Sequence, residues 1–447
     1  MEIRLRCKLL PLALVLLVSA CSSNNIYRSN YASCTYQQPG DCSTNALQVH
    51  SDDDGAGYTL GFVEYDDQGQ LRDPAQQDAV LDKYLNIAAG EDVLLISFIH
   101  GWHHDARPGD DNIESFRGLL TEVSAMETRA SQQQQRQKRR ILGVYVGWRG
   151  ESVEVPGLRY ATFWDRKSTA HTVGQQGVSE MLLKLEQIVN VRAGFEQDNP
   201  PPVNSRLVVV GHSFGGAVLY GSLQKILVDR FIGSRRGETS QGDVQGFGDL
   251  VVLMNPAFEA LRYSTLYDMS QAHCRAYFST QLPKLAILTS ETDYATRYAF
   301  PIGRFLNGLS ESYTTLDRHY CSQAGSAGMQ PMQIGEASAG RTTVGHFEPY
   351  LTHRLVPAPQ QALRAENFNV RQLQTRWSRQ EELGMPGFEG SELIHLQRST
   401  ALNPYLNIQV DSELIPDHNH IWGKEVVAFL RDLIAISTTP MQSASSE

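Results

Sequence analysis

Several short runs of apolar residues, each continuous rather than alternating, most constrain the fold of this 447-residue chain. Such runs are typical of strands covered on both faces, as in a parallel sheet. The runs are 93–100, 141–148, 206–213, 249–257 and 284–290. Segments with helical spacing lie between several of them, at 113–131, 178–195 and 217–232. The sequence therefore predicts an α/β fold, with a mostly parallel central sheet flanked by helices.

The regular alternation stops after residue 295 and returns near residue 406. Residues 296–400 contain glycines, prolines and scattered aromatics without a clear rhythm. A long irregular segment inside a regular α/β domain is usually functional, so we expect a cap-like insertion before the last strand. A final strand and helix are predicted at 406–415 and 420–436. The expected divisions are a domain over 60–436, with the insertion at 296–400, and a polar tail at 437–447.

The first twenty residues have the features of a signal peptide. Three basic residues precede an apolar stretch, 9–18, that is too short to span a bilayer. The residues VSAC that end at Cys21 resemble a bacterial lipobox, in which Cys21 becomes the lipidated first residue. A plain secretory signal cleaved nearby is the alternative. Ser22 resembles an outer-membrane sorting signal, so we expect a lipid-anchored protein of a Gram-negative envelope, facing the periplasm or the surface, with residues 21–59 as a tether.

Cysteine usage agrees with a secreted protein. Besides Cys7 in the signal segment and Cys21, four cysteines remain, an even number that suggests disulfides. They are Cys34, Cys42, Cys274 and Cys321. Three pairings are possible, of which Cys34–Cys42 and Cys274–Cys321 are the most local, and buried unpaired thiols are the alternative.

Two classes of partner have little support in the composition. The formal net charge is -10 and the pI is near 5.7, so no basic balance suggests nucleic acid. No C-x-x-C or H-E-x-x-H spacing occurs, so neither a structural nor a catalytic zinc site is expected. The oligomeric state is left open.

The stretch GHSFGG at 211–216 contains a Gly-x-Ser-x-Gly match. The match alone is weak, but a predicted strand precedes it and a predicted helix follows, which is where a nucleophile elbow lies. Glycines beside the serine suit a strained turn where strand and helix approach closely. The pattern favours Ser213 as a nucleophile over a glycine-rich packing turn.

With FIHGWHHDA at 98–106 ending an earlier strand, the sequence resembles the α/β-hydrolase superfamily over about residues 60–436. The resemblance implies an α/β-hydrolase fold with Ser213 as nucleophile. It also implies an oxyanion hole formed by the backbone N–H groups of Trp102 and Phe214. The alternative for His100-Gly101 is a turn that merely ends a strand.

The family's chain order of serine, acid and histidine implies the other two members of a triad. The acid is expected after the strand at 284–290, where Asp293 is preferred to Glu291, and Glu259 is held in reserve. The histidine is expected before the last helix, where the sequence HNHI offers His418 and His420. We select His418, because His420 stands where related sequences often carry an aspartate.

Three further stretches, FVEYDDQGQL at 62–71, GVYVGWRG at 143–150 and TFWDRKSTA at 162–170, resemble uncharacterised bacterial and fungal serine hydrolases. In the second stretch, Arg149 lies at a predicted strand end on the active-site side of the sheet. It is expected either to receive an anionic group of a substrate or to form a structural bridge to a carboxylate.

The expected function is that of a lipid-anchored serine esterase or lipase-like hydrolase. His418 would take the proton of Ser213, Asp293 would stabilise the imidazolium, and water would release the acyl-enzyme, so no cofactor and no metal are expected. The expected partners are a small-molecule or lipid ester and, through Cys21, a membrane. The alternatives are an acyltransferase on the same fold, or a non-catalytic envelope lipoprotein that binds with this scaffold.

Overall fold

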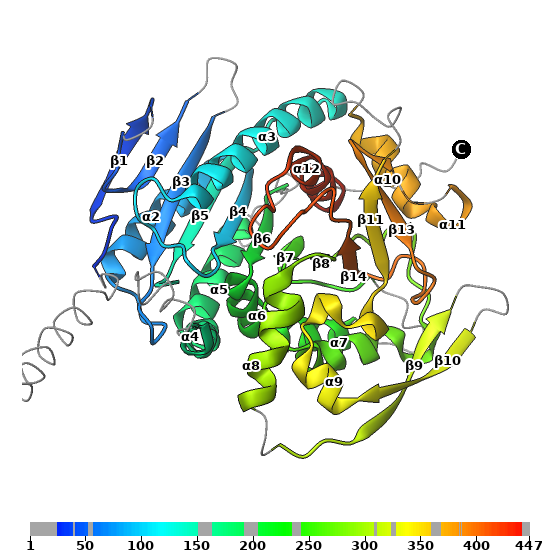
Figure 1. Ribbon diagram of the computed structural model, residues 1–447. Coiled ribbons are helices and arrows are strands. Elements are labelled where there is room, and N and C mark those ends of the chain that lie inside the picture. Colours follow the sequence, from blue (N-terminus) through cyan, green and yellow to red (C-terminus); the bar gives the residue numbers. More distant parts are fainter. Residues whose placement is uncertain are drawn as a thin grey trace, which may run out of the picture.

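The apolar runs of the sequence form the middle of a twelve-stranded sheet (Figure 1). The computed structural model describes residues 25–38, 41–51, 57–150, 163–191, 204–234, 243–307, 311–322, 328–358, 368–383, 385 and 387–439. The expected signal peptide, the expected lipidation site at Cys21 and the end of the polar tail lie outside these residues.

The order of the sheet is β1-β2-β3-β5-β4-β6-β7-β8-β14-β11-β13-β12. Every neighbouring pair from β3 to β11 is parallel, while β2 is antiparallel to β3 and β13 is antiparallel to β11 and β12. The α/β fold with a mostly parallel sheet is thus confirmed. The strands of the sheet are β1 (Asn30–Tyr36), β2 (Asn45–His50), β3 (Tyr58–Glu64), β4 (Val93–Ile99), β5 (Arg140–Gly147), β6 (Arg206–His212), β7 (Leu250–Met254), β8 (Leu285–Ser290), β11 (His353–Pro357), β12 (Gly387–Phe388), β13 (Ser391–His395) and β14 (Tyr405–Val410).

Helices cover both faces of the middle of the sheet, which is why the strands there are mostly apolar. In β4, Leu94, Ile96 and Phe98 pack toward α3 and α12, whereas Val93 and Leu95 belong to the core on the other face, under α2, α5 and α6. The helices are α2 (Pro74–Gly90), α3 (Asp111–Gln134), α4 (Phe163–Gln175), α5 (Gly177–Val189), α6 (Phe214–Gly233), α7 (Ala260–Gln271), α8 (Phe300–Asn307), α9 (Glu336–Arg341), α10 (Val370–Ser378), α11 (Gln380–Leu383) and α12 (Lys424–Thr438). Shorter helical turns are η3 (Ala272–Cys274), η4 (Ala295–Ala299), η5 (Val344–His346) and η6 (Glu348–Tyr350).

The strand order reverses at β4. Its sheet neighbours are β5 on one side and β6 on the other, so the loops that follow β4 and β6 leave the same edge of the sheet in opposite directions. In open α/β sheets a crevice forms at such a point, at the carboxyl ends of the strands. The loop after β4 carries Gly101 and Trp102, and the turn after β6 carries Ser213.

The segment from 296 to 400 divides into two parts. The first contains α8, α9 and the hairpin of β9 (Thr315–Ser322) and β10 (Gly328–Gly335), which lies beyond the main sheet (Figure 1). The second returns to the sheet, because β11 pairs in parallel with β14 and is followed by β12 and β13 at that edge. Only the first part therefore lies outside the main sheet as a cap-like insertion would.

The expected tether also contains sheet structure. Within residues 21–59, β1 and β2 extend the sheet beyond β3, and Ala46 and Leu47 are buried. These strands are rich in polar residues, and β1 is exposed along much of its length as an edge strand, so the apolar signal on which the sequence prediction relied is missing.

Both of the most local cysteine pairings are formed. One disulfide joins Cys34 to Cys42, between β1 and β2, and the other joins Cys274 to Cys321, between η3 and the hairpin strand β9. Within the described part of the chain, no helix has the length and apolar character needed to cross a bilayer.

Candidate active site

Ser213 occupies a strained turn between β6 and α6. Its φ is 55° and its ψ is -119°, a conformation that residues other than glycine rarely adopt. Main-chain hydrogen bonds hold it there: its N–H donates to the carbonyl of Met254 at 2.9 Å, and its carbonyl accepts from Ala257 at 3.1 Å. The turn thus fixes Ser213 immediately before the first residue of a 20-residue helix, whose N-terminus favours negative charge nearby.

Glycines let the loop after β4 approach this turn. A side chain at Gly215 would collide with the carbonyl oxygens of Ile99 and His100. A Cβ at Gly101 would lie 2.8 Å from the Cβ of Ser213. The sequence pattern of glycines around Ser213 therefore has a direct cause, which is contact between two backbones.

His418 and Asp293 complete a hydrogen-bonded chain with Ser213. The Nε2 of His418 lies 2.7 Å from the Oγ of Ser213, and its Nδ1 lies 2.7 Å from an Oδ of Asp293. With Asp293 ionised, Nδ1 donates to the carboxylate and Nε2 accepts from the serine hydroxyl. The three residues come from the loops after β6, β8 and β14, so the structure brings the preferred residues of the sequence prediction together.

Asp293 is fully buried and remains charged. Burial alone would raise its pKa, but the charge and hydrogen bond of His418, together with Thr296, lower the pKa to about 2. The hydroxyl of Thr296 donates to the carboxylate at 2.5 Å. Because the hydroxyl proton of Thr296 is donated to Asp293, the oxygen of Thr296 can only accept from His346, whose Nε2–H donates to it at 3.0 Å.

No role was predicted from the sequence for His346 or for Thr296. Burial lowers the pKa of His346 to about 4, so it is neutral at pH 7 and can act only as a hydrogen-bond partner. It lies 53 positions after Asp293 in a short turn, and no sequence spacing could have joined the two. Thr296 had a weak signal, since a hydroxyl three residues after the acid fits one helical turn.

Two further residues hold the backbone of His418. Its carbonyl oxygen accepts from the Nε2 of His212 at 2.9 Å and from the side-chain amide of Asn255 at 2.9 Å. Asn255 has a φ of 44°, and its Oδ1 accepts from the N–H of Ser290. Burial, followed by the neighbouring His418, lowers the pKa of His212 to about 3, so its ring stays neutral. The end of β6 and the turn after β7 are thereby bound to the loop after β14 at one carbonyl oxygen, and Asn255 also binds the last residue of β8.

His100 supports the loop that precedes Trp102. Its Nδ1–H donates to the carbonyl of Gly101 at 2.9 Å, and its Nε2 accepts from the N–H of Trp148 at 3.0 Å. The indole of Trp148 donates back to the carbonyl of His100 and stacks on its ring at 5.7 Å. His100 is therefore a buried support for the loop. The ring of Trp102 lies 6.4 Å from that of Phe214, and the oxyanion role of their N–H groups stays a prediction.

The alternative residues of the sequence prediction lie elsewhere. Glu291 pairs with Arg354, and Glu259 pairs with Lys167, Arg262 and Arg304, so neither carboxylate is bound to His418. His420 is exposed and pairs with Asp417. Arg149 and Arg166 both bind the carboxylate of Asp67, so Arg149 forms the structural bridge.

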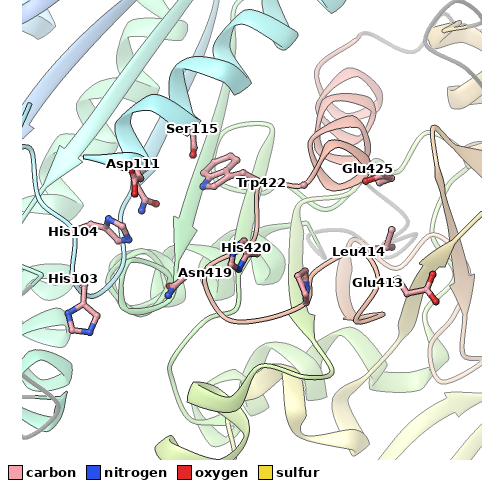
Figure 2. A pocket seen from close by; sticks show the side chains of 13 residues that line it. His103, His104, Asp111, Ser115, Glu413, Leu414, Asn419, His420, Trp422 and Glu425 are labelled. Carbon is pink, nitrogen blue, oxygen red and sulfur yellow. The ribbon is translucent and has the colours of Figure 1, made fainter. Parts of the chain in front are cut away.

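A surface pocket of about 730 Å³ adjoins these loops (Figure 2). Figure 2 shows His103 and His104 on one side, from the loop after β4, and His420 on the other, from the loop before α12. Ser213 does not line it, so the pocket is a neighbour of the hydrogen-bonded chain. Among the described residues, no group of three or more His, Cys, Asp or Glu side chains could hold a metal ion.

Comparison with known proteins gives little further guidance. No protein-family profile matches the chain, and no curated protein sequence matches it. Among solved structures, phospholipase PlaB from Legionella pneumophila matches with a TM-score of 0.27 and 9% identity over 54% of this chain and 50% of that one. The same phospholipase in complex with thio-NAD matches with a TM-score of 0.24 and 10% identity over 54% and 49%. The match spans about half the length of that protein, and at these TM-scores the function of this chain has to be inferred from its own geometry.

Proposed function

We propose that this chain is a serine hydrolase that cleaves carboxylic esters through an acyl-enzyme, anchored at the cell envelope through Cys21. The observation that carries the proposal is the chain of two 2.7 Å contacts from Ser213 through His418 to the buried charge of Asp293. A serine at a φ of 55° with this partner set is the arrangement of an activated nucleophile.

The chemistry follows from the atoms present. The Nε2 of His418 takes the hydroxyl proton as the Oγ of Ser213 forms a bond to the ester carbonyl carbon. Asp293 stabilises the resulting imidazolium and holds its orientation. The alkoxide oxygen of the tetrahedral intermediate would be stabilised by the N–H group of Phe214, at the N-terminus of α6, and by that of Trp102, in the loop after β4.

Breakdown of the intermediate releases the alcohol, which receives the proton from His418 and leaves the acyl group on Ser213. Water then attacks the acyl carbon while His418 again removes a proton, and the carboxylic acid departs. The supports of His418 by His212 and Asn255 keep the imidazole in place through both halves of the cycle.

The first prediction concerns Ser213→Ala. We expect the variant to lose turnover of p-nitrophenyl butyrate by at least about 10⁴-fold, because nucleophile and base act as a unit. It should also fail to be labelled by a fluorophosphonate probe, which reacts only with an activated serine. Ser412→Ala, in the loop of His418, is the matched control and should retain both properties. Labelling of the Ser213→Ala protein at the wild-type rate would refute the assignment.

A further inference from the structure

One face of the helical segment that follows Asp293 is apolar and exposed. The turn η4 and helix α8 run without a break from Ala295 to Asn307. Thr296 and Phe300 face inward and are buried. Four large side chains at helical spacing face outward, and we call them the apolar stripe: Tyr294 (68% exposed), Tyr298 (50%), Ile302 (63%) and Phe305 (47%).

The charges of this segment suit a lipid surface. Residues 295–307 contain two arginines and no carboxylate. Arg304 is turned to Glu259 and Glu311, whereas Arg297 is exposed and its guanidinium lies 5.6 Å from the ring centre of Tyr298. Tyrosine and arginine beside aliphatic and phenylalanine side chains are typical of helices that lie in the interface of a bilayer.

The apolar stripe lies beside the carboxyl ends of the strands, and the first described residues of the chain lie at the same end of the sheet. Tyr294 follows Asp293 directly, at the carboxyl ends of the strands. At the same edge, the N–H of Tyr27 donates to the carboxylate of Glu64, the last residue of β3, at 3.1 Å. The guanidinium of Arg28 donates to the carbonyl of Ala106, in the loop after β4, at 2.9 Å. The polypeptide thus enters the fold at the carboxyl ends of the strands, the same end of the sheet at which Ser213, His418 and Asp293 lie.

The expected anchor at Cys21 precedes Tyr27 by six residues, which span no more than about 20 Å of extended chain. A lipid attached to Cys21 would therefore keep the carboxyl edge of the sheet close to the bilayer. Figure 1 shows α8 at the outside of the molecule, with its far end pointing away from the sheet. The short linker restricts the orientations of the anchored domain, and the apolar stripe is an exposed apolar surface at this end of the sheet.

We propose that the apolar stripe docks on the lipid bilayer that anchors the chain. Tyr298, Ile302 and Phe305 enter the interface, and Arg297 binds headgroup phosphates. The inference deepens the proposed function, on which its consequence for substrate rests: an ester of a membrane lipid reaches Ser213 from the interface, without transfer through water.

Docking is tested without turnover by a tryptophan at the stripe. The full-length anchored chain carrying Phe305→Trp is incorporated in phosphatidylcholine vesicles with brominated acyl chains, which quench nearby indoles. The matched control is Phe278→Trp, which is 42% exposed in the loop before β8, at the opposite edge of the sheet. We expect the added fluorescence at position 305 to be quenched at least about twofold more than that at 278. Equal quenching at the two positions, or none at either, overturns the proposal.

The consequence for substrate is tested by activity on two esters. Ile302→Asp with Phe305→Asp should lower hydrolysis of a vesicle-embedded lipid ester about tenfold or more, because the stripe loses its apolar contact. Hydrolysis of soluble p-nitrophenyl butyrate should stay within about twofold, since no residue of the hydrogen-bonded chain is changed. Phe278→Asp is the control for an added charge and should leave both activities unaltered.

The outcomes separate the two proposals. If quenching is selective but no ester is hydrolysed, the docking surface stands and the hydrolase assignment fails. If both esters are hydrolysed equally by the double variant and the wild type, and quenching is absent, the docking surface fails and the assignment stands. If the double variant instead changes the molar mass of the chain without vesicles, the stripe is an interface with a second copy and the docking proposal is wrong.

Discussion

Asn255 shows how a single side chain can coordinate several loops. Its amide group donates to the carbonyl of His418, its oxygen accepts from the N–H of Ser290, and its backbone takes a left-handed conformation. Asparagine tolerates that conformation better than most residues. Because the imidazole of His418 is carried by the backbone that Asn255 holds, the amide is a positioning group and need not contact a substrate.

The variant Asn255→Asp isolates this role. The carboxylate keeps the size, the backbone preference and the acceptor for Ser290, but it cannot donate to the carbonyl of His418. We expect kcat/KM for p-nitrophenyl butyrate to fall roughly 10- to 100-fold, as a displacement near 1 Å of a catalytic group can cause. The fluorophosphonate labelling rate should fall with it while the melting temperature changes little. Asn419→Asp, an equal charge change beside His418 in the loop before α12, is the control, and equal losses of kcat/KM in the two variants would contradict a positioning role.

Among the elements, α3, β5 and α12 are held together by a buried charge. Glu127 on α3 binds Arg136 and Arg139, and the guanidinium of Arg139 also donates to the carbonyl of Thr438 at the end of α12. Both Glu127 and Arg139 are buried. Burial raises the pKa of Glu127, but the two arginines more than offset it and hold the pKa at about 2.

Removing that charge should be costly to the fold. In Glu127→Gln the guanidinium of Arg139 stays buried without its counter-charge, so we expect the free energy of unfolding in urea to drop by about 3–5 kcal/mol. Glu122→Gln on the same helix removes a half-exposed carboxylate 3.9 Å from Arg431 and should change the value by less than about 1 kcal/mol. The two variants should leave fluorophosphonate labelling of the folded protein intact. If Glu127→Gln lowered the free energy of unfolding as little as Glu122→Gln does, the buried pair would not be what holds these helices together.

The pattern of the elements explains what could be predicted from the sequence. Strands such as β4 and β6 are apolar along most of their length because helices cover both faces, so they were recognisable without a structure. The polar edge strands β1 and β2 carry no such signal, and the pairing of β11 with β14 depends on chain folded back over fifty residues. In the same way, Ser213 and its downstream partners follow a chain order, whereas His346, Thr296 and Asn255 reach the site through contacts that leave no spacing in the sequence.

At the scale of the whole molecule, burial keeps many histidines neutral. Burial is the largest cause of a pKa well below the ordinary value of 6.5 for His100, His171, His212, His346, His353 and His395. In the unfolded chain these rings take up protons near pH 6.5, whereas in the folded chain five of them do so near pH 4 or below and burial holds the pKa of His353 well below its ordinary value. Over that interval the unfolded chain binds more protons than the folded chain.

The folded state should therefore lose stability as the pH falls from about 6.5 to 4, before the buried carboxylates Glu127, Glu259 and Asp293 begin to protonate toward pH 2. Melting temperatures between pH 7 and pH 4 measure the effect. His395→Asn, at a ring remote from Ser213, should make the decline shallower by about one proton. A melting temperature that is constant from pH 7 to pH 4.5 would contradict the prediction.

The hold on His418 has a consequence for engineering. His212 and Asn255 grip its carbonyl oxygen, an atom that every amino acid possesses, so the loop is fastened independently of which side chain it presents. The imidazole at position 418 can therefore be exchanged for another side chain, natural or synthetic, while the backbone of the loop keeps its conformation.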